Sequence, residues 1–126
     1  MKSILINSLC FLLAFSACQP KPFTQLTPES YQRMLEEKGG EVIDVRTPEE
    51  FAAGHLAGAR LSDWRSGDFA TEMQQWDKSK TYYLYCASGN RSGQALEKMK
   101  EAGFQKVYNL GAYPALKQAG VAVEAP

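Results

Sequence analysis

The amino-acid sequence predicts an α/β domain built on a mostly parallel central sheet with helices on both faces. Short apolar and aromatic runs at residues 42–45, 81–85 and 107–110 have the composition of strands that are buried on both sides. Segments with helix-start signals or helical periodicity separate these runs, and strands that alternate with helices favour parallel pairing. A length of 126 residues fits one domain with a single core.

The first part of the domain contains two similar helix starts. Residues 23–26 alternate as a short edge strand does. The Thr-Pro-Glu sequence at residues 27–29 then supplies a capping side chain, a proline for the first turn and a carboxylate for the positive end of a helix. That helix is expected to end at residues 38–40. After the first buried strand, the same triplet at residues 47–49 predicts a second, short helix that stops at Gly54.

The second part continues the alternation of strands and helices. Residues 55–59 carry too much glycine for a helix and are predicted to form a loop that leads to a small strand near residues 60–61. Phe69, Met73 and Trp76 have the spacing of a helix face that packs on the core. The remaining predicted elements are a polar turn at residues 77–80, a strand over 81–85, a helix over 93–100 that Gly103 ends, a strand over 107–110, a short helix through Gln118 and a small strand around 121–123.

Cys86 follows the strand over residues 81–85 and lies on the turn into the next helix. Ligands of parallel sheets bind at the carboxyl ends of strands. Backbone N–H groups in such a turn, together with the positive end of the helix dipole, stabilise an anion, including a thiolate. Surroundings of this kind lower a cysteine pKa from about 8.5 into the range of roughly 3.5–7.5. The position therefore predicts a nucleophilic cysteine.

The amino-terminal residues differ in kind from the rest of the chain. A largely apolar run over residues 4–15 is shorter than the roughly 18–20 residues that a membrane span needs. Phe15-Ser16-Ala17-Cys18 resembles a bacterial lipobox. We therefore expect a signal peptide over residues 1–17, a lipidated Cys18 with a short tether over residues 18–22, and a folded domain over residues 23–126. The alternative is an ordinary signal peptide cut nearby, which would leave Cys18 as a free thiol.

These features predict an exported protein in the periplasm or cell envelope, attached to a membrane only through the lipid on Cys18. Lysine and arginine together number 14, as do aspartate and glutamate, so no basic field favours a nucleic-acid partner. No glycine motif for nucleotide phosphates is present, and no cofactor is expected. One histidine and so few cysteines supply too few ligands for a metal site at any known spacing.

The cysteine count leaves one candidate nucleophile. Cys10 lies in the predicted signal peptide and Cys18 is expected to carry lipid, so Cys86 remains alone. A single thiol in an oxidising compartment is either buried or reactive. The glycine-containing loop and Arg91 after Cys86 favour reactivity.

Four other polar residues are candidates for supporting roles. Asp44 interrupts an apolar strand, and a buried carboxylate has to be paired. Arg46 and Glu50 are its nearest candidate partners, and we expect this charge network to brace a loop rather than to react. His55 is the only histidine, but its glycine-flanked position favours a structural hydrogen bond over a general-base role.

The length of the cysteine loop separates two kinds of chemistry. Protein tyrosine phosphatases use Cys-x5-Arg followed by serine or threonine, with a histidine before the cysteine. This chain has Cys-x4-Arg, from Cys86 to Arg91, and Tyr85 before the cysteine. A shorter loop makes a smaller cradle, which favours a sulfane sulfur over a tetrahedral phosphate.

Several ordered motifs together resemble a single-domain rhodanese, a sulfurtransferase module. They are Asp44-Val45-Arg46, Glu50-Phe51, the run from Gly54 to Ala59, the loop from Cys86 to Arg91 with Ser92, and Asn109-Leu110-Gly111. The resemblance covers residues 23–123 and implies a rhodanese-like α/β fold. It also implies transfer of a sulfane sulfur, from thiosulfate or a persulfide to a thiol or cyanide, through a persulfide on Cys86.

The resemblance also assigns roles to the other residues. Arg91 would hold the loop and attract an anionic donor, and the amides of the loop would cradle the transferred sulfur. The cradle residues would be Ala87, Ser88, Gly89, Asn90 and Arg91, and the residues that support them from behind would be Asp44, Arg46, Glu50, His55 and Ser92. The expected partners are a small sulfur-containing anion or persulfide and a thiol acceptor, which a protein could supply, and the chain is expected to be a monomer.

The chain departs from the family at Ala87, where many active members carry a basic residue, so thiosulfate is expected to be a poor substrate. Ala112 and Leu116 also replace a glycine and a tryptophan that are frequent in the family, which affects packing. A persulfide carrier or binding module without multiple turnover is the first alternative function. A cysteine-dependent phosphatase or arsenate reductase is the second.

Overall fold

The computed structural model describes residues 24–125. The predicted signal peptide, the tether and the lipidation site at Cys18 lie outside the described residues. The elements in chain order are α1 (Pro28–Lys38), β1 (Glu41–Asp44), α2 (Pro48–Ala52), β2 (His55–Leu56), β3 (Arg60–Leu61), α3 (Asp68–Glu72), the 3-10 helix η1 (Met73–Gln75), β4 (Thr81–Cys86), α4 (Asn90–Glu101), β5 (Lys106–Ala112), α5 (Tyr113–Gln118) and β6 (Val123–Glu124).

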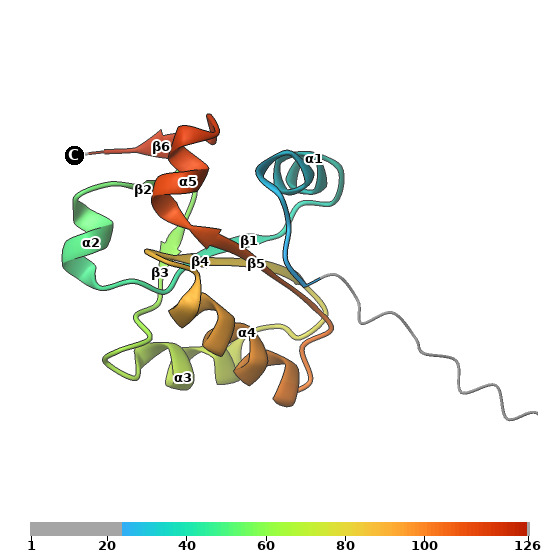
Figure 1. The fold of residues 1–126 in the computed structure, drawn as a ribbon. Helices are drawn as coiled ribbons and strands as arrows, with labels where there is room; N and C mark the ends of the chain where they lie inside the picture. The colour runs from blue at the N-terminus through green and yellow to red at the C-terminus, as the bar shows by residue number, and fades with distance from the viewer. Residues whose placement is uncertain (1–23, 126) are drawn as a thin grey trace, which may run out of the picture.

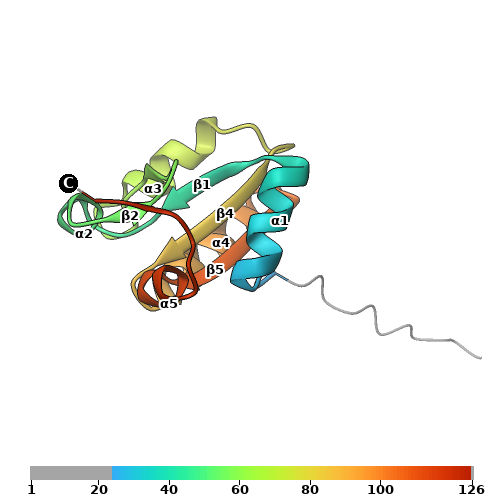
Figure 2. The same ribbon diagram turned by 90° about the horizontal axis from the view of Figure 1, so that it is seen from above.

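A four-stranded sheet in the order β3-β1-β4-β5 forms the centre of the domain, and all of its strand pairs are parallel. Helices α1 and α5 cover one face of this sheet, and α3 and α4 cover the other (Figure 1). The view from above shows α1 and α5 lying along the same face (Figure 2). The predicted α/β class, with a mostly parallel sheet and helices on both faces, is confirmed.

Strand β4 supplies the centre of both hydrophobic layers, because successive side chains of a strand point to opposite faces. Tyr82, Leu84 and Cys86 belong to the cluster that packs against α3 and α4. Tyr83 and Tyr85 belong to the cluster that packs against α1 and α5. The Cys86 side chain therefore lies on the α4 side of the sheet, at the carboxyl end of a buried strand.

Both predicted helix starts are present. The Thr27 hydroxyl accepts a hydrogen bond from the Ser30 amide at 3.1 Å and caps α1. Thr47 and Glu50 form a reciprocal capping box at the start of α2, in which each side chain accepts a hydrogen bond from the other residue's backbone amide. This box fixes the direction of the Glu50 side chain, which matters for the site described below.

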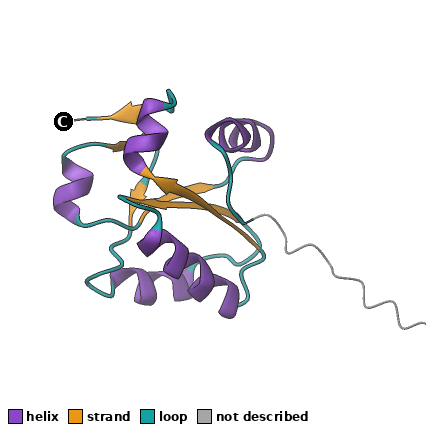
Figure 3. Cartoon of the chain, viewed as in Figure 1, coloured by secondary structure: helices purple, strands orange, loops and turns teal. Residues whose placement is uncertain are grey.

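The prediction of a loop over residues 55–59 is wrong for its first two residues. His55 and Leu56 form β2, which pairs antiparallel with β6 in a small second sheet (Figure 3). Helix α4 also begins at Asn90, earlier than the predicted start at residue 93. The left-handed Gly89, with φ of +90°, closes the turn early enough to bring Arg91 and Ser92 into the first helical turn.

Residues 24–26 of the predicted edge strand form only an isolated parallel bridge from Gln25 to Asn109, and other differences concern the ends of elements. The last strand lies at Val123–Glu124 rather than around 121–123, and β5 extends beyond the predicted 107–110 at both ends. Within residues 24–125, no helix combines the length and the apolar character that crossing a bilayer requires.

Candidate active site

The candidate nucleophile is the last residue of β4. Cys86 is fully buried, and residues 87–89 connect it to the first turn of α4. Gly89 is required in this connection for two reasons: its φ is +90°, and a Cβ atom there would lie 3.3 Å from the Gly111 Cα of the neighbouring strand. The turn can therefore pass close to β5 only with glycine at this position.

Two hydrogen-bond donors contact the Cys86 sulfur. The Gly89 amide lies 3.0 Å from Sγ, and the Ser92 hydroxyl lies 3.4 Å from it. Burial acts to raise the pKa of the Cys86 thiol. Hydrogen bonds from the Ser92 hydroxyl and from the amides of Ser92, Ser88 and Gly89 outweigh burial and hold this pKa below its ordinary value. The site therefore favours a thiolate.

Of the predicted cradle of residues 87–91, the Gly89 amide contacts Sγ directly, and a cradle for the transferred sulfur stays a prediction. The Asn90 amide does not reach the sulfur and donates to the Ser88 hydroxyl at 3.4 Å. Ser88 and Asn90 are exposed, and Ala87 is partly buried. Ser92 was expected to support the loop from behind, but its side chain lies directly against the sulfur, because α4 begins at Asn90.

Arg91 is bound to a carboxylate. Its guanidinium makes two hydrogen bonds to Glu50, with Nη1 to Oε1 at 2.8 Å and Nη2 to Oε2 at 3.1 Å. These hydrogen bonds, with smaller help from Thr47, lower the pKa of Glu50 to about 2. The expected network of Glu50 with Asp44 and Arg46 is therefore wrong: Glu50 pairs with Arg91 and ties α2 to the cysteine loop.

Asp44 and Arg46 form a separate buried pair at the end of β1. Arg46 donates to both carboxylate oxygens of Asp44, the shortest distance being 2.7 Å from Nη2 to Oδ2, and its Nη2 also donates to the Gly54 carbonyl at 2.6 Å. The guanidinium lies 4.3 Å from the centre of the Tyr113 ring. Through the Gly54 carbonyl, this pair holds the segment between α2 and β2, which fits the loop-bracing role expected from the sequence.

Tyr85 joins the Asp44 pair to the cysteine strand, and sequence reasoning missed this role. Its hydroxyl donates to Asp44 Oδ2 at 2.7 Å and accepts from the Leu56 amide at 2.9 Å. Burial, and then the nearby Asp44 charge, raise the pKa of Tyr85, so the phenol stays protonated. The available signal was the tyrosine directly before the candidate nucleophile, in a strand predicted to be buried.

Both ring nitrogens of His55 contact groups other than the Cys86 sulfur. Nδ1 lies 3.0 Å from the Phe51 carbonyl oxygen, and Nε2 lies 3.1 Å from Glu124 Oε2. The imidazole also stacks on the Phe51 ring, with 3.7 Å between the ring centres. The geometry is that of the structural hydrogen bond expected from the sequence.

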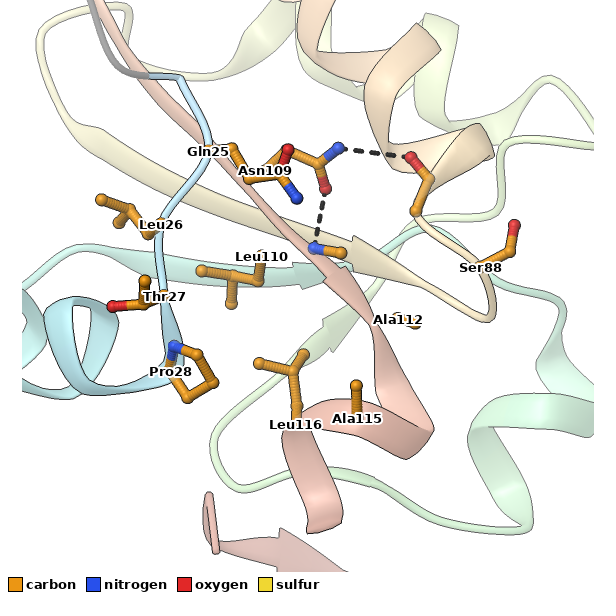
Figure 4. Close-up of a pocket in the computed structure, with 12 residues that line it drawn as sticks. Gln25, Leu26, Thr27, Pro28, Ser88, Asn109, Leu110, Ala112, Ala115 and Leu116 are labelled. Atoms are coloured by element: carbon orange, nitrogen blue, oxygen red, sulfur yellow. Dashed lines mark hydrogen bonds between the residues drawn. The ribbon is translucent and has the colours of Figure 1, made fainter. Parts of the chain in front are cut away.

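Asn109 is a further residue of the site that the sequence did not single out for a role. Its side chain reaches from β5 to the turn after Cys86 and contacts Gly89, Ser92 and Gly111. The two dashed lines at Asn109 in Figure 4 are its hydrogen bonds to the Gly89 carbonyl and the Gly111 amide, and Asn109 lines a groove of about 820 Å³ beside the loop. Apolar groups form much of that groove, including Leu26, Pro28, Leu110 and Leu116.

The part of the chain that the structure describes contains no group of three or more histidine, cysteine, aspartate or glutamate side chains placed to hold a metal ion. The polar groups in contact at the site are the Cys86 thiol, the Gly89 amide and the Ser92 hydroxyl. A buried thiol with a lowered pKa, held by donors that favour an anion, is the arrangement of a cysteine nucleophile.

Comparison with known proteins identifies a family for most of the chain. The model of the rhodanese-like domain family matches residues 27–119. The thiosulfate sulfurtransferase GlpE of Pseudomonas aeruginosa is 36% identical over 89 residues, which cover 70% of this chain and 77% of that protein. The uncharacterized protein YqhL of Bacillus subtilis is 32% identical over 107 residues, which cover 81% of this chain and 78% of that protein.

Solved structures are similar to the same region. The solution structure of a rhodanese-like domain from Anabaena aligns with a TM-score of 0.72 and 26% identity, over 82% of this chain and 80% of that one. The crystal structure of a rhodanese-like domain protein from Staphylococcus aureus aligns with a TM-score of 0.68 and 28% identity, over 82% of this chain and 99% of that one.

Proposed function

The chain belongs to the rhodanese-like domain family, and from this premise we propose that it is a sulfurtransferase that carries a sulfane sulfur on Cys86. The single observation behind this proposal is the setting of the Cys86 sulfur, which is buried and accepts hydrogen bonds from the Gly89 amide and the Ser92 hydroxyl. These donors stabilise a negative charge both on a thiolate and on the persulfide that replaces it.

In the first half-reaction, the Cys86 thiolate attacks the outer sulfur of the donor. With thiosulfate, a bond forms between Sγ and that sulfur, the sulfur–sulfur bond of the donor breaks, and the electron pair leaves with sulfite. With an organic persulfide, the leaving group is the corresponding thiolate. The product in each case is a persulfide anion on Cys86.

In the second half-reaction, an acceptor nucleophile attacks the outer sulfur of the Cys86 persulfide. Cyanide would form a carbon–sulfur bond and leave as thiocyanate, and a thiolate would leave as a new persulfide. The electron pair of the broken sulfur–sulfur bond returns to Sγ and restores the thiolate. Neither half-reaction consumes an oxidant or a reductant.

Steady-state turnover tests this proposal. The full chain is supplied with thiosulfate, or with glutathione persulfide, and with cyanide, and thiocyanate is measured over many equivalents of protein. Thiocyanate formation that Cys86→Ser abolishes is expected. Equal thiocyanate formation by Cys86→Ser would contradict the proposal, because the nucleophile would then lie elsewhere.

A persulfide carrier is the second candidate function, and the pairing of Arg91 with Glu50 favours it. Both guanidinium hydrogen bonds are made to a carboxylate that stays charged, so the cation beside the loop is balanced before any donor arrives. Ala87 adds no positive charge. A carrier would hold a stable persulfide on Cys86 with negligible multiple turnover to thiocyanate, whereas an enzyme would turn over rapidly.

We propose that the mature protein is an exported lipoprotein of the periplasm or cell envelope, on the strength of the apolar run over residues 4–15 and the Phe15-Ser16-Ala17-Cys18 sequence. Cells that express the full chain are grown with a palmitate analogue. Label on the wild type and none on Cys18→Ser is expected. Equal label on both, or on neither, would remove the lipoprotein assignment.

A further inference from the structure

Three side chains form a hydrogen-bonded series that leads away from the sulfur. The Ser92 oxygen lies 3.4 Å from Cys86 Sγ and 2.8 Å from Asn109 Oδ1. The same Asn109 oxygen accepts from the Gly111 amide at 2.9 Å, and Asn109 Nδ2 donates to the Gly89 carbonyl at 3.2 Å. Asn109 therefore reaches the two residues that contact the sulfur.

The orientation of the Asn109 amide follows from its backbone partners. The Gly111 N–H is only a donor, and the Gly89 carbonyl is only an acceptor, so Oδ1 has to face Gly111 and Nδ2 has to face Gly89 (Figure 4). Oδ1 is thus the atom that faces Ser92. Since a carbonyl oxygen only accepts, the hydroxyl proton of Ser92 points toward Asn109 when these two residues are hydrogen-bonded.

Ser92 has one hydroxyl proton and two acceptors that compete for it. When Cys86 is a thiol, the S–H group can donate to the Ser92 oxygen while Ser92 donates to Asn109. When Cys86 is a thiolate, the sulfur only accepts, so a hydrogen bond between Ser92 and the sulfur requires the Ser92 proton to turn toward it. A hydrogen bond from Ser92 to the thiolate therefore replaces the hydrogen bond between Ser92 and Asn109.

We propose that Asn109 is a positioning residue that holds the Ser92 hydroxyl proton away from Cys86 in the thiol state and yields it to the sulfur in the thiolate state. Asn109 thereby sets how readily the nucleophile forms. The inference rests on the proposed function only in taking Cys86 as the nucleophile, because the ionisation is a property of the chain without donor or acceptor.

Two features of the site separate this role from a general structural one. The Gly89 carbonyl also accepts the first helical hydrogen bond of α4, from the Gly93 amide at 3.0 Å, so Gly89 stays held without Asn109. The charged groups around the sulfur also do not involve Asn109. Arg91 on α4 interacts with the charge on Cys86 and pairs with Glu50 on α2, and the Asp44–Arg46 pair lies at the end of β1.

The test measures the pKa of Cys86 from the ultraviolet absorbance of its thiolate as a function of pH. It uses the full chain and subtracts the Cys86→Ser variant, which removes the signals of the other cysteines and the tyrosines. Ser92→Ala is expected to raise the pKa, because the thiolate loses a donor. Asn109→Ala is expected to lower it by about half to one pH unit, the equivalent of one ordinary hydrogen bond.

The double variant decides whether Asn109 acts through Ser92. In the Ser92→Ala background, Asn109→Ala is expected to leave the pKa of Cys86 unchanged. Gln25→Ala is the matched control, since Gln25 lines the same groove while the Ser92 hydroxyl bonds to Cys86 and Asn109, and it should leave the pKa of Cys86 unchanged. A raised pKa in Asn109→Ala, or the same shift with and without Ser92, would overturn the inference.

Asn109→Asp keeps the inference testable if Asn109→Ala unfolds, which its thermal unfolding curve would reveal. Aspartate has the same shape and keeps an acceptor for the Gly111 amide, but its carboxylate holds the Ser92 proton more strongly and adds a negative charge. The pKa of Cys86 should rise, and an unchanged or lowered pKa would contradict the inference. Absence of sulfur transfer would count against the proposed function and would leave this measurement unaffected.

Discussion

At the scale of single residues, the hydrogen bonding of the Cys86 sulfur depends on how closely the turn after it can approach β5. The Gly89 amide contacts the sulfur at 3.0 Å, and Gly89 also lies against Gly111 of β5. Both contacts require a left-handed residue without a side chain. The donor to the sulfur and the packing of the turn are therefore properties of the same glycine.

Gly89→Ala is expected both to lower the free energy of unfolding and to destabilise the Cys86 thiolate. The left-handed backbone alone costs an alanine about 1–2 kcal/mol, and the Cβ contact with Gly111 adds to this. Displacement of the Gly89 amide should also raise the pKa of Cys86. Urea unfolding and the thiolate absorbance would measure the two effects.

Gly58→Ala is the matched control for this prediction. Gly58 also has a positive φ, of +75°, but a Cβ there meets nothing within 4 Å. It should show the backbone cost of about 1–2 kcal/mol without any change at Cys86. If Gly58→Ala shifted the pKa of Cys86 as far as Gly89→Ala does, the local explanation for Gly89 would be wrong.

At the scale of elements, the short helix α2 is linked to the cysteine loop by one ion pair. Thr47 caps α2 and orients Glu50, and Glu50 binds Arg91 in the first turn of α4. The helix has no buried residue of its own. Its position therefore depends on this polar link and on the segment that leads into β2.

Glu50→Gln is expected to lower the free energy of unfolding at neutral pH by about 1–3 kcal/mol, between the values of exposed and buried pairs. The pKa of Glu50 in the folded chain is about 2, against 4.5 for an unperturbed glutamate. The pair therefore contributes fully above roughly pH 4.5, and its contribution is lost as the pH falls toward 2.

Urea unfolding of the wild type and Glu50→Gln at several pH values checks this prediction. The difference between the two proteins should be greatest near neutral pH and should narrow below pH 4.5. A difference that stays constant down to pH 3 would show that Glu50 acts through packing rather than through its charge.

Thr47→Ala should lower the free energy of unfolding by about 1 kcal/mol, because α2 loses its cap. It should also weaken the ion pair between Glu50 and Arg91, because Thr47 orients Glu50. Thr27→Ala is the matched control, because it removes the same type of cap from α1, where the Thr27 hydroxyl binds Ser30. Both variants should lose similar stability in urea unfolding. Only Thr47→Ala should change the rate of persulfide formation; equal changes in both would contradict the special role of α2.

At the scale of the whole molecule, one tyrosine connects the two sheets. The Tyr85 hydroxyl binds Asp44 of β1 and the Leu56 amide of β2, so it links the large parallel sheet to the small β2–β6 sheet. All of these groups are buried. Removal of the hydroxyl leaves a buried carboxylate oxygen and a buried amide with fewer partners.

Tyr85→Phe is expected to cost about 1–3 kcal/mol of stability, the usual penalty for a buried polar group that loses its partner. Tyr83→Phe is the matched control. Its hydroxyl donates only to the Gly39 carbonyl at 2.9 Å, near the other end of the sheet. Urea unfolding should show the smaller loss for Tyr83→Phe, and the reverse order would contradict this account of the link.

Local signals explain which parts of the molecule the sequence predicted. The Thr-Pro-Glu helix starts and the run from Thr81 to Tyr85 depend on neighbouring residues, and the structure confirms them. The strand at His55–Leu56 was missed because its partner, Val123–Glu124, lies at the other end of the chain. The pairing of Glu50 with Arg91 was missed for the same reason, since 41 residues separate them.

The place of Ser92 and Asn109 depends on a single backbone angle. Only the left-handed Gly89 starts α4 early enough to turn Ser92 toward the sulfur, and only then does Asn109 of β5 reach it. A pattern of residue types does not specify that angle. The sequence could therefore predict Cys86 and its loop, but not which donors contact the sulfur.

The most direct test of the central claim is the intact mass of the chain after incubation with thiosulfate and, separately, with glutathione persulfide. The sulfurtransferase account predicts a gain of one sulfur atom on Cys86 that cyanide removes and that Cys86→Ser does not show. No Cys86-dependent gain of sulfur from either donor, in chain that remains folded, would contradict the account.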